Sequence, residues 1–89
     1  MIDIDLEEYG RYLMTYRHYS DIIRRRDISF IRVHLQNYTI EDILQVTDPR
    51  VIVESITGVR YSSGKAMNKT KIASITHLQD YLRNRGAAA

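Results

Sequence analysis

Residues 4–33 read IDLEEYGRYLMTYRHYSDIIRRRDISFIRV, a stretch without proline and with one glycine, Gly10. Apolar and aromatic side chains recur in it at spacings of three, four and seven residues, at Leu6, Tyr9, Leu13, Tyr16, Ile23 and Phe30, and Tyr12, Tyr19, Ile22 and Val33 widen this stripe. Such a period is typical of one face of an amphipathic helix. The pattern therefore predicts one long N-terminal helix over residues 4–33.

Three polar or small residues could interrupt this helix. Gly10 costs about 1 kcal/mol relative to alanine inside a helix, so the helix could begin near Tyr9 instead. Ser20 and Asp27 place polar groups in the stripe, which argues against a long, strict coiled coil. A break at residues 27–29 is the alternative to a continuous helix.

The middle of the chain contains two sets of helix start signals. Thr39, followed by two acidic residues, is a suitable N-cap and predicts a short helix over residues 39–46. Asp48 and Pro49 form a second start, with aspartate as N-cap and proline at the first helical position. This start predicts a helix over residues 49–57 that ends at Gly58. The alternative there is a short strand, because residues 51–53 are β-branched.

The C-terminal part combines a polar joint with a basic helix. Residues 59–68 are rich in serine, glycine, lysine and asparagine, so we predict a loop there. Within it, we expect residues 61–68 to be exposed and more mobile than the flanking helices. The spacing of Ile72, Ile75, Leu78 and Leu82 predicts a last helix over residues 69–85. The complete pattern predicts an all-α fold, a small bundle of three to four helices with the long N-terminal helix packed on the C-terminal helix.

Length and composition limit the classes of protein to which the chain can belong. Eighty-nine residues suit a single domain, which we place at residues 1–86, with 87–89 as a frayed tail or an artificial extension. The absence of cysteine excludes disulfides and favours a cytoplasmic location. The acidic start is not a signal peptide, and no apolar run approaches the roughly 20 residues of a membrane span.

The charge is distributed unevenly along the chain. Residues 1–54 contain 7 basic and 10 acidic side chains, whereas residues 55–89 contain 6 basic side chains and one acidic side chain, Asp80. The basic residues of the second part are Arg60, Lys65, Lys69, Lys71, Arg83 and Arg85. They predict a broad positive surface that attracts an acidic protein or a nucleic acid. The alternative is a solvated surface that binds nothing.

Tyrosines crowd one side of the predicted N-terminal helix. We consider the set Tyr9, Tyr12, Leu13, Tyr16 and Tyr19 a protein-interaction surface, because tyrosine offers a large contact area at low entropic cost. Two other interpretations stay open: a core whose hydroxyls reach its rim, and a platform on which unpaired bases stack. The stripe of Leu6, Tyr9, Leu13 and Tyr16 also predicts a homodimer.

Arginines gather near the tyrosines, at Arg24, Arg25 and Arg26 with Arg17 and Arg32 on either side. Successive arginines on a helix point in different directions, so a solvated or acid-paired cluster is favoured over a DNA-reading stripe. A helix-turn-helix at residues 39–57 is disfavoured, because the turn is too short and its second helix is mostly apolar.

The sequence offers no constellation for catalysis, a metal or a cofactor. His18, His34 and His77 are far apart and lack metal-ligand spacing. Ser63-Gly64-Lys65 is similar to the end of a phosphate-binding loop, but the upstream glycines are absent. We therefore expect no enzymatic activity and no cofactor.

The layout resembles a known family. A tyrosine-rich helix at residues 9–26, followed by the polar joint ITGVRYSSGKAMNKT at residues 56–70, is similar to the N-terminal helical region of the ArpU/RinA-like phage transcription regulators. Members of that family carry a C-terminal helix-turn-helix that is absent here, and residues 34–55 have no counterpart. The resemblance implies an interaction module without a DNA-reading part.

These observations predict a small non-enzymatic regulatory protein, related to phages or mobile elements. It would act through protein–protein contact in the control of transcription or defence, with no membrane partner. The alternative is a small DNA-binding protein that uses the basic C-terminal half. An enzyme is the third class, and the lack of a catalytic constellation disfavours it.

Overall fold

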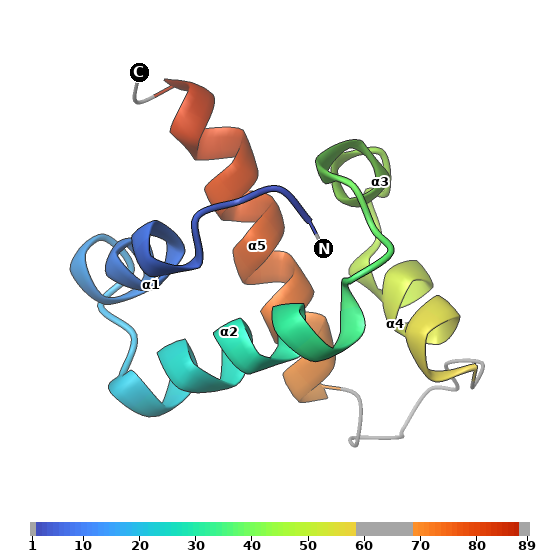
Figure 1. Cartoon of the computed structure of the whole chain (residues 1–89), viewed down its shortest axis with the longest axis horizontal. Helices are drawn as coiled ribbons and strands as arrows, with labels where there is room; N and C mark the ends of the chain where they lie inside the picture. The colour runs from blue at the N-terminus through green and yellow to red at the C-terminus, as the bar shows by residue number, and fades with distance from the viewer. Residues whose placement is uncertain (1, 59–68, 88–89) are drawn as a thin grey trace. The chain divides into compact units, whose positions relative to one another are not determined.

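The computed structural model describes residues 2–58 and 69–87, with side chains as far as residue 84. Its elements are five helices: α1 (Leu6–Thr15), α2 (Asp21–His34), α3 (Ile40–Leu44), α4 (Pro49–Thr57) and α5 (Lys69–Ala87) (Figure 1). No strand occurs in the described ranges, so the predicted all-α class is confirmed. The predicted loop at residues 59–68 lies outside the described residues.

The predicted long helix over residues 4–33 is wrong, because the chain turns between α1 and α2. Ser20 is the N-cap of α2, and its hydroxyl accepts a hydrogen bond from the backbone N–H of Ile23 at 3.3 Å. Two residues before it, His18 adopts a positive φ of 56°. Serine at an N-cap satisfies a backbone donor that a new helix leaves unpaired, so a helix start here is locally stabilised.

The alternative break at residues 27–29 is also wrong. Asp27 lies inside α2 and is buried, and its carboxylate lies 4.0 Å from the Arg26 guanidinium. The polar residue that interrupts the apolar stripe is thus accommodated within a continuous helix. Of the two polar interruptions in the stripe, Ser20 caps the start of a new helix, whereas Asp27 lies within a continuous one.

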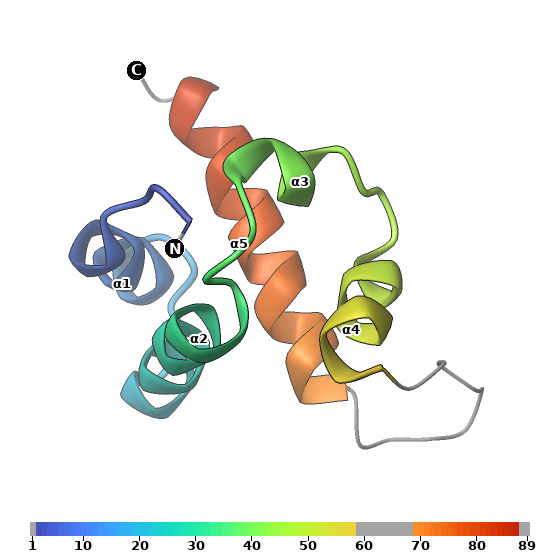
Figure 2. The same ribbon diagram turned by 45° about the vertical axis from the view of Figure 1, so that its right-hand side comes forward.

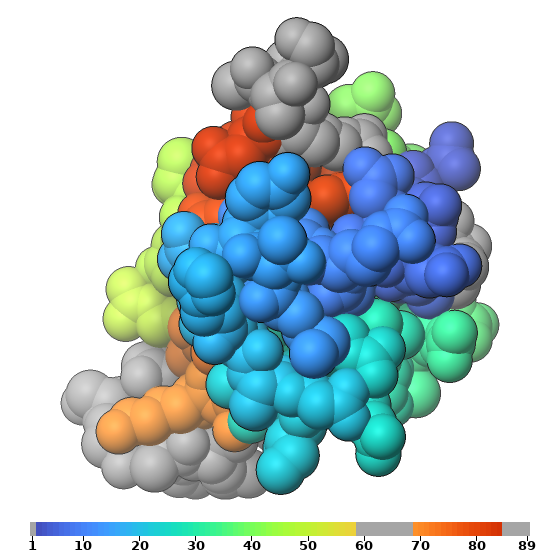
Figure 3. Space-filling view, turned by 90° about the vertical axis from the view of Figure 1, so that its left-hand side faces the viewer, coloured from blue at the N-terminus to red at the C-terminus, as the bar shows by residue number. Residues whose placement is uncertain are grey.

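The described chain divides into two compact units, Met1–Ile40 and Glu41–Ala89. In the first unit α1 packs against α2, and Figure 3 shows the blue atoms of α1 directly against the teal atoms of α2. Its buried apolar side chains are Ile2, Tyr9, Leu13, Phe30, Ile31 and Leu35. Two compact units can belong to one folding domain, so the single domain at residues 1–86 stays a prediction.

Gly10 has a packing role that the sequence did not reveal. It is buried within α1, and a Cβ built on it would lie 3.2 Å from Cδ1 of Ile28 and 3.3 Å from Cδ of Arg24. The absence of a side chain therefore lets α1 approach α2 closely. The helix begins at Leu6, four residues before the glycine, with Asp5 as its N-cap.

In the second unit α4 packs against α5, as the yellow and orange ribbons of Figure 2 show. The predicted helix at residues 49–57 is confirmed, with the Asp48 carboxylate as N-cap and Gly58 as C-cap at a φ of 70°. The buried Gln79 amide of α5 donates hydrogen bonds to the carbonyls of Ile43 at 3.2 Å and Val46 at 2.7 Å. These bonds join α3 and the turn after it to α5. None of the helices in the described ranges is long and apolar enough to span a bilayer.

Candidate protein-binding site

The predicted tyrosine set is divided between the interior and the surface. Tyr9 and Leu13 are fully buried, whereas Tyr12 and Tyr19 are half-buried. Tyr16 is 75% exposed. A dimer seam that uses Tyr9 and Leu13 would therefore require unit 1 to rearrange, and only the three other tyrosines are accessible to a partner.

The reason for this division is that α1 ends at Thr15. Tyr16 is its C-cap and bonds through its backbone N–H to the carbonyl of Tyr12 at 3.0 Å. Tyr19 belongs to the connection, where its N–H bonds back to the carbonyl of Leu13 at 3.0 Å. Tyr9 and Tyr12 therefore lie within α1, Tyr16 caps its end, and Tyr19 lies beyond it. The four tyrosines do not share one face of a single helix.

The accessible tyrosines and Arg17 form two pairs of side chains at the end of α1 and in the connection that follows it. The rings of Tyr12 and Tyr16 lie 6.0 Å apart between centroids, with an interplanar angle of 32°. The guanidinium of Arg17 lies 5.8 Å from the centroid of the Tyr19 ring, and it donates a hydrogen bond of 3.4 Å to the Tyr19 hydroxyl. We call Tyr12, Tyr16, Arg17 and Tyr19 the α1–α2 corner.

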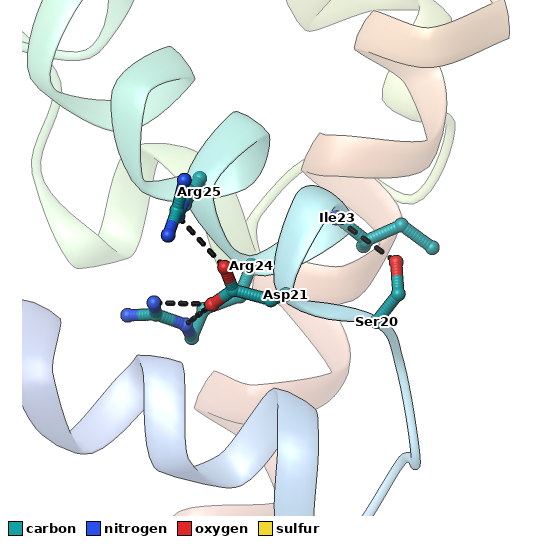
Figure 4. Close-up of polar contacts among 5 residues, drawn as sticks. All are labelled: Ser20, Asp21, Ile23, Arg24 and Arg25. Carbon is teal, nitrogen blue, oxygen red and sulfur yellow. Dashed lines mark hydrogen bonds and ion pairs between the residues drawn. The ribbon is translucent and has the colours of Figure 1, made fainter.

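The arginine cluster at the start of α2 is paired with acid, as the sequence predicted. Figure 4 shows the Asp21 carboxylate between the guanidinium groups of Arg24 and Arg25. Arg24 donates through Nε at 2.9 Å and also pairs through Nη2, and Arg25 Nε lies 2.8 Å from the other carboxylate oxygen. The hydrogen bond from Arg24 lowers the pKa of Asp21, and the charges of Arg24 and Arg25 act in the same direction.

A pH dependence follows from this lowered pKa. Asp21→Asn is expected to destabilise the protein most at neutral pH, where the wild-type carboxylate is charged and paired. Because the folded-state pKa is lowered, that contribution is present above the unfolded-state pKa and is lost as the pH falls through the folded-state pKa. Urea unfolding of both proteins across an acidic pH series measures the difference. The pairing would be contradicted if the loss of unfolding free energy caused by Asp21→Asn did not change with pH. It would also be contradicted if that loss were equally large in an Arg24→Gln background.

The predicted basic surface is only partly described. Arg60 and Lys65 lie outside the described residues, as does the side chain of Arg85. Of the others, Lys69 and Arg83 are exposed and Lys71 is half-buried. Lys69 and Arg83 are about 21 Å apart along the axis of α5, at 1.5 Å per residue. The described cations therefore lie toward opposite ends of α5 and form no single dense patch.

The structure offers no described metal centre. Among residues 2–58 and 69–84, no three histidine or acidic side chains gather in a way that could hold a metal ion.

Comparisons of the chain with protein-family models, with curated proteins and with solved structures find no match.

Proposed function

We propose that this protein is a non-enzymatic interaction module that binds a protein partner through the α1–α2 corner. The observation that supports the proposal is the exposed ring of Tyr16, held against Tyr12 beside the Arg17–Tyr19 pair. Tyrosine and arginine are among the residue types that most often contribute large binding energies at protein interfaces. A surface whose rings are already held in place also loses little entropy on binding.

The distribution of exposed apolar side chains supports the same assignment. Four large ones in the first unit are exposed, namely Met14, Tyr16, Ile22 and Val33, whereas Val51 is the one such side chain in the described part of the second unit. A larger number of exposed apolar side chains on one unit favours that unit as the place where a partner docks. The first unit is therefore the part that we assign to binding.

The resemblance to phage regulators gives this module its proposed setting. We place it in the cytoplasm as a regulator of transcription or defence, related to phages or mobile elements, that forms contacts with another protein. A homodimer stays part of the proposal, but through the accessible corner rather than through Tyr9 and Leu13, which are buried.

The test is affinity capture from an extract of the host cell with wild-type protein and a Tyr16→Ala/Arg17→Ala variant. The partner is expected to be captured by wild type and lost with the variant, because truncation of a hot spot weakens binding by about 2 kcal/mol, or about 30-fold in Kd. Val51→Ala, which removes an exposed apolar side chain from the second unit, is the matched control and should capture normally. Equal capture by all three proteins would refute the site.

A further inference from the structure

The solvent-facing side of α2 has a second set of exposed residues that the corner does not include. Its members recur at helical spacing and are all exposed: Ile22, Arg25, Arg26, Ser29, Arg32 and Val33. At about 100° per residue, Ile22 and Val33 point within about 20° of each other and lie about 16 Å apart along the axis. We call these six residues the outer face of α2.

The chemistry of this face is apolar at both ends and basic between them. Ile22 is 76% exposed and Val33 is 62% exposed, although both are large aliphatic side chains. Three arginines lie between them, and no acidic residue belongs to the face. Arg25 pairs with Asp21, and Arg26 lies 4.0 Å from the buried Asp27 carboxylate. No carboxylate in the described part of the chain pairs with Arg32, so Arg32 is the arginine of this face that most needs a partner.

We infer that the outer face of α2 binds an acidic amphipathic helix of a partner protein, with carboxylates opposite the arginines and an apolar residue opposite each end. This inference rests on the proposed protein-binding function and names the chemistry of the partner. Complementary charge steers such a helix to the face and sets its register. The aliphatic ends provide contact area that is removed from water on docking.

Two other occupants fit the face less well. A phosphate backbone would pair with the arginines but would leave Ile22 and Val33 without apolar contact. The same face of a second copy would bring two sets of arginines together, and like charges at close range are repulsive. An acidic helix with apolar ends is the occupant that matches both the charge and the exposed aliphatic side chains.

The experiment uses a synthetic helical peptide with two leucines eleven positions apart and glutamates between them on the same face. Surface plasmon resonance measures its binding to the full chain. Arg26→Glu/Arg32→Glu is expected to slow association about tenfold, because solvent-exposed charges of a binding face act mainly on the on-rate. Ile22→Ser/Val33→Ser is expected to speed dissociation about tenfold, since changes in apolar contact act mainly on the off-rate.

The controls separate this inference from its rivals and from the proposed function. Lys69→Glu/Arg83→Glu makes the same change in net charge on α5 and should leave peptide binding unchanged. Peptide binding that is insensitive to both α2 variants overturns the inference. Binding of duplex DNA that depends on the arginines but not on Ile22 and Val33 would also overturn it. Self-association of the protein that Ile22→Ser/Val33→Ser abolishes would overturn it as well. The two proposals can fail separately. If the outer face does not bind the peptide, capture of a partner through Tyr16 and Arg17 is still expected, and if that capture fails, binding of the peptide is still expected.

Discussion

Leu13→Ala is expected to lower the free energy of unfolding by about 2–5 kcal/mol, because it removes a fully buried side chain and leaves a cavity in the first unit. Small domains have total stabilities of about 5–15 kcal/mol, so this loss would unfold a large fraction of the protein on mild heating. Urea unfolding followed by far-UV circular dichroism measures it.

Met14→Ala is the matched control for this prediction. Met14 is the next residue in α1 but is 43% exposed, whereas Leu13 is fully buried. Its truncation should change the free energy of unfolding by only about 0.5 kcal/mol. Equal losses from the two variants would mean that α1 buries a different face. Because Leu13 is buried within one chain, its effect should also be independent of protein concentration. A concentration-dependent effect would instead place Leu13 in the predicted dimer seam.

Gly10→Leu is expected to force α1 away from α2 and to destabilise the first unit by about 1–3 kcal/mol, as overpacking does in other cores. The position is already too tight for a Cβ at an ordinary contact distance, since Ile28 and Arg24 are 3.2 Å and 3.3 Å from where that atom would be. Thermal unfolding of the variant beside wild type measures the loss. The physical reason is steric, so leucine should be harmful although it is a better helix former than glycine.

Gly10→Ala separates the effect of this glycine on helix propensity from its effect on the packing of α1 against α2. Alanine gains about 1 kcal/mol of helix propensity over glycine. Against that gain, its Cβ would have to displace the flexible ends of Ile28 and Arg24 by a few tenths of an ångström. The two effects oppose each other, so we expect the stability to stay close to that of wild type. A loss as large as that of Gly10→Leu would mean that even one carbon cannot be accommodated. Stabilisation by leucine would show that α1 and α2 do not pack at this point.

Part of the candidate site could be predicted from sequence. The tyrosine pattern predicted an aromatic surface, and Tyr12, Tyr16 and Tyr19 are accessible in the structure. The pattern also included Tyr9 and Leu13, which are buried, because spacing along a helix shows which residues share a face but not what covers that face. The outer face of α2 could have been found by counting from Ile22 at helical spacing. In the predicted continuous helix, Ile22 and Val33 instead widen the apolar stripe, and the arginines form a separate cluster.

The sequence by itself determined the all-α class and the helix over residues 49–57. Asp48, Pro49 and Gly58 each act on backbone groups within a few residues, so local chemistry decides where that helix begins and ends. The same kind of signal exists at Ser20, whose hydroxyl caps α2. At Ser20, however, the apolar spacing continues across the turn and predicts an unbroken helix. Hydrophobic spacing alone does not show whether the chain continues as one helix or turns and begins a second one.

Only the tertiary structure decided which residues α1 buries and which it exposes. Once the chain turns after Thr15, α1 packs against α2 through the close approach at Gly10, Leu13 becomes part of the interior, and Tyr16 is left at the surface. Asp27 is buried in α2 for the same kind of reason, because its burial depends on packed neighbours and not on its own polarity. Burial is a property of contacts between segments distant in sequence, and no local pattern contains it.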